Sequence, residues 1–183
     1  MKNKNLRRWA AAAHIVAIAL AVCASPARAE NDARLESALT DAMRLDIDKP
    51  MDRVGDGGAA IQGYVAAGYL AKRPNTRLDY TDYWWLKKSA PFMTHELVMI
   101  EQEYMSAWVG CCVSPGVGVT VRVHGSTANL EQFARANKCS IETNVNLTDV
   151  AKLSHIALSS IRKGRYATMS CRERDIQDRD GSQ

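Results

Sequence analysis

The stretch from Tyr80 to Gly118 constrains the fold more than any other part of the chain. It reads YTDYWWLKKSAPFMTHELVMIEQEYMSAWVGCCVSPGVG, and it combines the aromatic bulk that a small core needs with two adjacent cysteines and a Pro-Gly turn. The sequence before it has helical patterns, and the sequence after it alternates between strand and helix patterns. We therefore expect this stretch to join an N-terminal helical part to a small sheet.

The first 29 residues have the pattern of a cleaved secretory signal. A basic segment precedes an apolar run from Ala10 to Ala24, and Ala27-Arg28-Ala29 offers small residues at both recognition positions of a signal peptidase. The run is too short to span a bilayer, which needs about 20 apolar residues. We expect cleavage before Glu30, no stable membrane span afterwards, and a periplasmic or secreted location.

Removing this leader changes the charge balance. Residues 1–29 hold five of the 24 basic residues and none of the 20 acidic ones, which leaves 19 against 20 and a net charge of −1. A balance of this kind gives no indication of a nucleic-acid partner. The remaining 154 residues suit one domain with its own core, and we expect it to span residues 30–171.

Four cysteines follow the leader, and an exported chain keeps disulfides. An even number is consistent with two bridges. A bridge between the two neighbouring cysteines would strain the peptide between them, so we expect each of these two to bind one of the later pair. Redox and metal-binding functions are disfavoured because the pattern is not CxxC and no histidine stands at ligand spacing. The cysteines concerned are Cys111, Cys112, Cys139 and Cys171.

Two helices are expected in the N-terminal part, at Glu30–Asp46 and Ala59–Lys72, because apolar residues recur there at helical spacing. Aspartates cluster between them from Asp46 to Asp56. The spacing does not match a calcium loop, since Pro50 stands at a ligand position. We interpret these aspartates as helix caps.

The segment Leu78–Leu86 is aromatic and acidic, and it has two interpretations: a strand or turn whose aromatics join the core, or an exposed patch that binds a partner. In an extended chain the two adjacent tryptophans face opposite sides, so one of them should be more exposed. The candidate binding residues are Asp79, Tyr80, Asp82, Tyr83, Trp84 and Trp85.

The segment Thr94–Val109 is predicted as a helix, because its apolar residues fall on one helical face and alternation is poor. Glu101 then lies within the apolar arc, and a buried carboxylate of this kind can mark a site. Two sharper hypotheses arise here: a hydrolase using Glu101, Glu103 and His95, and a copper site formed by Met93, His95 and Met99. Methionine at this spacing is more typical of a core.

The C-terminal half has a clear alternating strand at Val117–Val123, a helix after Thr127, a strand at Cys139–Thr143, a helix at Leu147–Ile161 and a strand at Gly164–Cys171. We predict an α+β fold with N-terminal helices and a small disulfide-stabilised sheet that has helices packed on one face. Residues 172–183 are charged, and we expect a disordered tail.

No persuasive catalytic set is visible in the sequence, and no cofactor or metal is expected. A leader, a small single domain, balanced charge and disulfides favour a non-enzymatic function. We therefore expect a soluble binding protein, of inhibitor or immunity type, that acts on another protein of the cell envelope. The small hydrolase with Glu101, Glu103 and His95 is the alternative.

Overall fold

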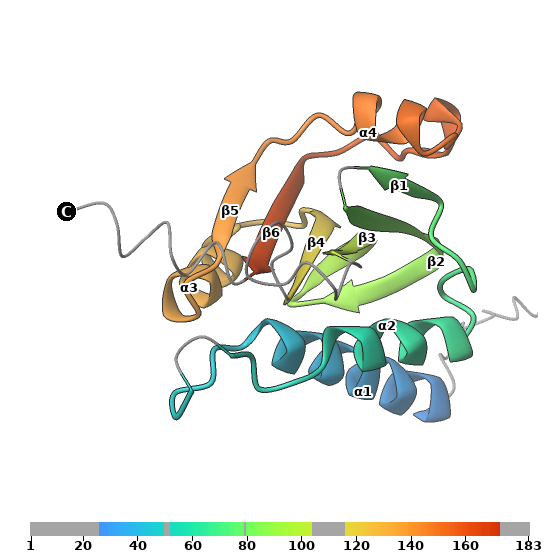
Figure 1. Cartoon of the computed structure of the whole chain (residues 1–183). Helices are drawn as coiled ribbons and strands as arrows, with labels where there is room; N and C mark the ends of the chain where they lie inside the picture. The colour runs from blue at the N-terminus through green and yellow to red at the C-terminus, as the bar shows by residue number, and fades with distance from the viewer. Residues whose placement is uncertain (1–25, 50–51, 79, 104–115, 173–183) are drawn as a thin grey trace, which may run out of the picture.

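The computed structural model describes residues 26–49, 52–78, 80–103 and 116–172, and these form the predicted α+β fold (Figure 1). Within these ranges no helix is long and apolar enough to cross a membrane. The elements in chain order are α1 (Pro26–Met43), α2 (Gly57–Ala66), β1 (Thr76–Leu78), β2 (Thr81–Phe92), β3 (His95–Glu103), β4 (Gly116–Arg122), α3 (Ala128–Ala136), β5 (Ser140–Thr143), α4 (Thr148–Leu153), a 3₁₀ helix (Leu158–Ser160) and β6 (Tyr166–Arg172).

The strands form one six-stranded sheet in the order β1-β2-β3-β4-β6-β5, and every neighbouring pair is antiparallel. Strands β1 to β4 follow one another as a meander. Strand β6 lies between β4 and β5, so β4 and β5 run parallel and α3 lies on the connection between them. Strand β6, the last strand of the described residues, is therefore an inner strand of the sheet.

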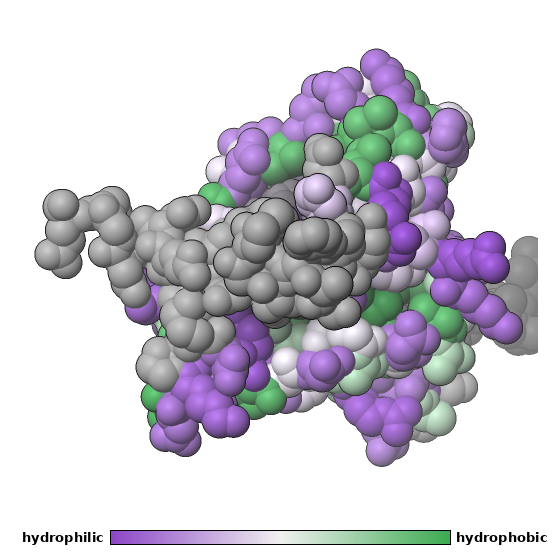
Figure 2. Space-filling view, viewed as in Figure 1, coloured by the Kyte–Doolittle hydropathy of each residue, from purple (hydrophilic) through white to green (hydrophobic). Residues whose placement is uncertain are grey.

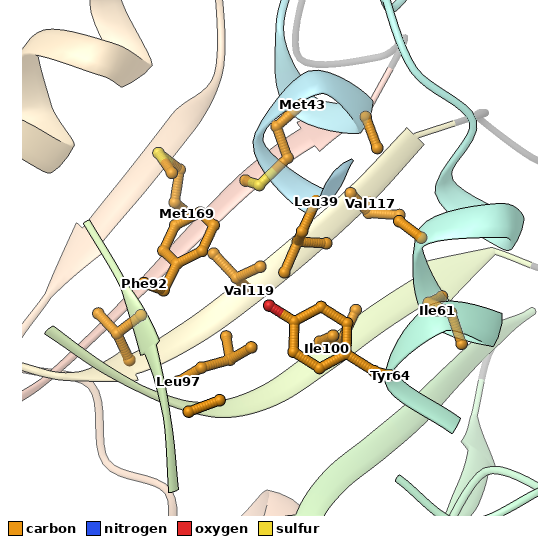
Figure 3. Packing of buried hydrophobic residues seen from close by; sticks show 14 of the residues in the cluster. Leu39, Met43, Ile61, Tyr64, Phe92, Leu97, Ile100, Val117, Val119 and Met169 are labelled. Carbon is orange, nitrogen blue, oxygen red and sulfur yellow. The ribbon is translucent and has the colours of Figure 1, made fainter. Parts of the chain in front are cut away.

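The main core lies between one face of the sheet and the helices α1 and α2, which pack against that face in Figure 1. Leu39 and Met43 of α1 and Ile61 of α2 meet Ile100 and Val119 of the central strands (Figure 3). Burying side chains of this size contributes about 1.5–3 kcal/mol each. The predicted helical spacing in α1 thus corresponds to the face that the helix buries.

Asp56 supports the predicted role of the aspartates as caps. Its extended backbone precedes α2, and its Oδ1 accepts a hydrogen bond from the Ala59 amide at 2.5 Å. Asp46 acts in the loop between α1 and α2 in a similar way, because its Oδ1 accepts from the Asp48 amide at 2.9 Å. Local hydrogen bonds of this kind fix turns and helix starts.

A second, smaller cluster covers the opposite face of the sheet. The segment that contains α4 lies over this face (Figure 1), and it buries Leu147 and Ala151 against the sheet residues Trp85, Met99 and Tyr166. The expectation that one of the adjacent tryptophans is exposed is therefore wrong: Trp84 is 7% and Trp85 6% exposed. They do face opposite sides, but both sides of the sheet are covered.

The prediction of a helix at Thr94–Val109 is also wrong, because residues His95–Glu103 form strand β3. Both faces of β3 are buried, which removes the alternation of apolar and polar residues by which a strand is recognised. The strand follows a two-residue turn at Met93 and Thr94, whose φ angles of 47° and 69° are those of a tight hairpin. Residues 104–109 lie outside the described part of the chain.

Two boundaries near the C-terminus differ from the prediction. The expected helix Leu147–Ile161 is divided, because α4 ends at Leu153 and His155 takes a left-handed φ of 54°. Left-handed residues stop helices, but they are usually glycine, so the sequence lacked the signal. Arg172 belongs to β6 and is buried, whereas we assigned it to the tail; residues 173–183 lie outside the described residues.

Cys139 and Cys171 form a disulfide, with Cα atoms 4.3 Å apart. The expected connectivity, in which each of them binds Cys111 or Cys112, is therefore wrong. Ser140 pairs with Ser170 at the start of β5, so the cysteines extend this register by one position and bridge neighbouring strands. Sequence spacing could not show this, because the strand order was unknown. Cys111 and Cys112 lie outside the described residues.

Replacing both bridged cysteines in the variant Cys139→Ala/Cys171→Ala should lower the free energy of unfolding by about 3–4 kcal/mol, because the bridge closes a loop with a sequence separation of 32. Urea denaturation measures this loss. The matched control is Ser140→Ala beside Cys139, at an exposed position, which should change stability by less than about 0.5 kcal/mol. Equal stabilities of the double variant and the wild type would contradict the prediction.

Candidate functional site

The structure does not bring the predicted binding residues together on one surface. Tyr80 is 46% exposed at the turn before β2, whereas Asp82 is buried and accepts hydrogen bonds from Arg77 at 2.6 and 2.9 Å. Trp84 and Trp85 belong to different core clusters on opposite faces. Tyr83 packs partly buried against the second cluster, and Asp79 lies outside the described residues.

Glu101 is buried, as the sequence indicated, but it belongs to an ion-pair network. Its Oε1 lies 2.7 Å from Arg172 Nη2, and Glu103 Oε1 lies 3.7 Å from Arg172 Nε. The Glu101 side chain lies across Gly118 of β4, where any Cβ would meet it at 2.9 Å or less. The network therefore depends on a glycine in the neighbouring strand.

The third member of the hydrolase hypothesis, His95, stands at the other end of β3. It lies six positions before Glu101, or about 20 Å along a strand. Its Nδ1 accepts a hydrogen bond from the His124 amide at 3.1 Å, and its Nε2 lies 3.0 Å from Asn129 Oδ1. Through these two contacts His95 links the start of β3 to the loop after β4 and to the start of α3. The proposed catalytic set is therefore not assembled.

The copper hypothesis meets the same difficulty. Met93 packs against the main core and Met99 belongs to the cluster on the opposite face, while both nitrogens of His95 are already bonded to the protein. Among the described residues no group of three or more His, Cys, Asp and Glu side chains has the arrangement of a metal site.

A pocket of about 380 Å³ opens on the face of the sheet that carries Trp85 and Tyr166. It lies where the strand pairing is irregular: the β2–β3 register shifts between Trp85 and Ala90, and the β3–β4 register shifts between Leu97 and Met99. Bulges re-aim side chains and are common beside functional sites. The residues around the pocket are Trp85, Leu86, Lys87, Lys88, Ser89, Glu96, Leu97, Val98, Arg122, Ile156, Ser160, Ile161, Arg162 and Tyr166.

Glu96 is the only carboxylate among these lining residues, and two guanidinium groups contact it. Arg122 lies opposite Glu96 in the β3–β4 register and donates to its Oε2 through Nε at 2.8 Å and through Nη2. Arg162 contacts Oε1 from the segment before β6, and His124 Nε2 lies 3.8 Å from Oε2. The Glu96 side chain is only 7% exposed, so its charge needs these partners.

The pocket has a surplus of positive charge. Besides Lys88, its lining contains three cationic side chains, Arg122, Arg162 and Lys87, and a single carboxylate, Glu96. The Arg162 side chain is 57% exposed. Lys87 is exposed at the β2 bulge, and within the described part of the chain no ion pair engages its ammonium group. Lys88 is turned away, since its Nζ donates to the Ala67 carbonyl at 3.0 Å and lies 4.0 Å from the Tyr69 ring centroid.

Tyr166 joins the apolar floor of the pocket to this charged cluster. It lies opposite Arg122 in the β4–β6 register, and its hydroxyl donates to the Arg162 carbonyl. Burial raises the pKa of the Tyr166 hydroxyl, and the neighbouring Arg122 and Arg162 guanidiniums only partly lower it. The hydroxyl is therefore a neutral hydrogen-bond donor that fixes the backbone position of Arg162.

Sequence reasoning missed this site. The signal available was the Lys87-Lys88 pair, which follows the two tryptophans after Leu86 and places cations beside an aromatic strand. The partners of Glu96 could not be inferred, because Arg122 and Arg162 are far from it in sequence and meet it only through the strand order β3-β4-β6.

No known family model matches the chain, and neither a curated protein nor a solved structure shows significant similarity to it.

The Glu101 network yields a test of the second face. Gly118→Ala should lower the free energy of unfolding by about 1–3 kcal/mol, because its Cβ would displace the Glu101 carboxylate from Arg172. In the double variant Gly118→Ala/Glu101→Ala the added methyl meets no carboxylate, so the glycine substitution should cost much less than it does alone. Chemical denaturation of the four proteins measures this coupling, and purely additive losses would contradict it.

Proposed function

We propose that this protein is an exported binding protein of inhibitor or immunity type, which acts on another protein of the cell envelope through the pocket between the β2 bulge and Arg162. The observation that carries this proposal is the pocket itself: an apolar floor of Trp85, Val98 and Tyr166 meets a surplus of cations at an open mouth. Apolar anchors surrounded by polar groups are typical of protein-binding surfaces.

The state of the buried carboxylates supports a binding role over catalysis. The described buried acidic residues are Asp82, Glu96, Glu101 and Glu103, and each is paired with an arginine. A carboxylate that is already paired with a guanidinium group is poorly placed to take a proton from a substrate. The hydrolase alternative accordingly has no assembled group among the described residues in its favour.

Two features are compatible with the proposed location. The leader has the pattern of a secretory signal, and the disulfide between Cys139 and Cys171 is of the kind that persists in oxidising compartments. A partner in the same compartment would meet the folded, cross-linked protein.

The proposal predicts that immobilised protein retains a specific partner from an envelope extract at physiological salt. The variant Lys87→Glu/Arg162→Gln should retain it about tenfold less, because it removes complementary charge at the mouth. Quantitative mass spectrometry of the bound fraction measures the difference.

The matched control is Lys49→Glu, which changes an exposed charge in the loop between α1 and α2, away from the pocket. It should retain the partner like the wild type. Folding of the pocket variant is checked by its melting temperature, and Arg122 still pairs Glu96 there. Repeated recovery of no specific partner, or equal recovery by all three proteins, would count against the proposal.

A further inference from the structure

The pocket has more positive charge than its own carboxylate neutralises, and this imbalance identifies the chemistry of its occupant. Arg122 directs its Nε and Nη2 at Glu96 and is largely buried, so its charge is used inside the protein. Lys87 and the exposed part of Arg162 remain at the mouth. A carboxylate is the natural complement of an exposed guanidinium with an ammonium group nearby.

The apolar residues of the pocket indicate which kind of group accompanies the carboxylate of the occupant. Trp85, Val98, Ile156 and Ile161 line the pocket, and a volume of about 380 Å³ is at the lower end of the range for ligand sites. A space of this size suits one large apolar side chain, with Arg162 next to it for an acidic group.

A second hollow continues this surface beyond Arg162. It has a volume of about 290 Å³ and shares Ile161, Arg162 and Tyr166 with the first pocket. Leu158 at its side is 47% exposed, and Figure 2 shows apolar surface among polar residues over α4 and its neighbourhood. The two hollows therefore flank the same arginine.

We infer that the site receives a short segment of the partner protein in which an acidic side chain stands between two apolar ones. The acidic group pairs with Arg162 and Lys87, one apolar side chain enters the pocket over Trp85, and the other lies in the hollow beside Leu158. This inference rests on the proposed function and specifies which kind of partner surface is recognised. Lys87 and Ser89 line the pocket and are exposed to solvent, so they are accessible to such a segment.

The two adjacent tryptophans supply an internal reporter and its control. Trp85 lines the pocket, whereas Trp84 is buried in the main core on the opposite face. Protein labelled with 5-fluorotryptophan would show both in a fluorine NMR spectrum, and the variants Trp84→Phe and Trp85→Phe would assign them. An occupant of the pocket should shift the Trp85 signal and leave the Trp84 signal unchanged.

The probe is the peptide acetyl-Gly-Phe-Asp-Leu-Gly-amide, and its matched control has Asn in place of Asp. The acidic peptide should shift Trp85 in a saturable way, and the Asn peptide should bind about tenfold or more weakly, since it loses a hydrogen bond between charged groups. Lys87→Gln and Arg162→Gln should each reduce this preference, whereas Lys49→Gln should leave it intact. Lys87→Gln removes no ion pair between described residues and so should not disturb folding.

Equal binding of the Asp and Asn peptides, or no shift of Trp85 with either, would overturn the inference. Tighter binding of N-acetylphenylalanine than of the acidic peptide would overturn it as well, because the ligand would then be a free carboxylic acid. The proposed function is judged separately by the extract: a pocket-dependent partner together with equal peptide affinities refutes only the inference. A selective response to the acidic peptide without any partner from the extract supports the inference and refutes the envelope role.

Discussion

Burial of the central strands on both faces is the constraint on which the rest of the structure depends. Strand β3 has no solvent-facing side, so each polar group on it needs a partner inside the protein. Glu96 finds Arg122 and Arg162, and Glu101 finds Arg172. The same requirement holds in β4, where Thr120 lies 2.9 Å from Thr168 of β6, oxygen to oxygen. Apart from the Arg162 contact, these interactions join different strands, so the charged and polar residues help to specify the strand order as well as to stabilise it.

The two ion-pair groups on β3 have different surroundings. The group around Glu101 is enclosed in the protein, and the group around Glu96 lines the pocket. At one end, Glu101 is held by Arg172 over Gly118, where the Glu101 side chain itself leaves no space for a Cβ. At the other end, where Glu96 lies, the pairing of β2 with β3 is interrupted by the bulge between Trp85 and Ala90. The Glu101–Arg172 contact is therefore enclosed, whereas the Glu96–Arg162 contact lines an open pocket. The Arg162 side chain remains partly exposed there.

Features that follow from the local spacing of residues could be predicted from the sequence. Features that depend on the arrangement of the strands and on what covers them could not. The α+β class, helix α1 and the alternating strand β4 followed from residue spacing, since one face of each is apolar. The prediction of a helix at β3 was wrong because a strand that is buried on both faces lacks the alternation of apolar and polar residues. The disulfide partners and the Glu96–Arg122 pair depend on which strands are neighbours, and the burial of both Trp84 and Trp85 depends on the covering of both sheet faces. The site combines β2, β3, β4 and a segment before β6, so no single stretch of sequence contains it.

The end of the sheet remote from the pocket explains how such an irregular site keeps its geometry. Arg53 donates to the carbonyls of Met43, Asn137 and Arg172, at 2.9, 2.7 and 3.2 Å, and so ties the ends of α1, α3 and β6 together. The Cys139–Cys171 bridge joins the residue before β5 covalently to β6. Strand β6 carries Tyr166 at its other end, and the Tyr166 hydroxyl binds the Arg162 carbonyl. The backbone of Arg162 is thus positioned by a strand that the disulfide cross-links. The residues of the β2 bulge at the mouth of the pocket are exposed to a partner. A charged group that is positioned in advance by a regular strand is suited to recognition.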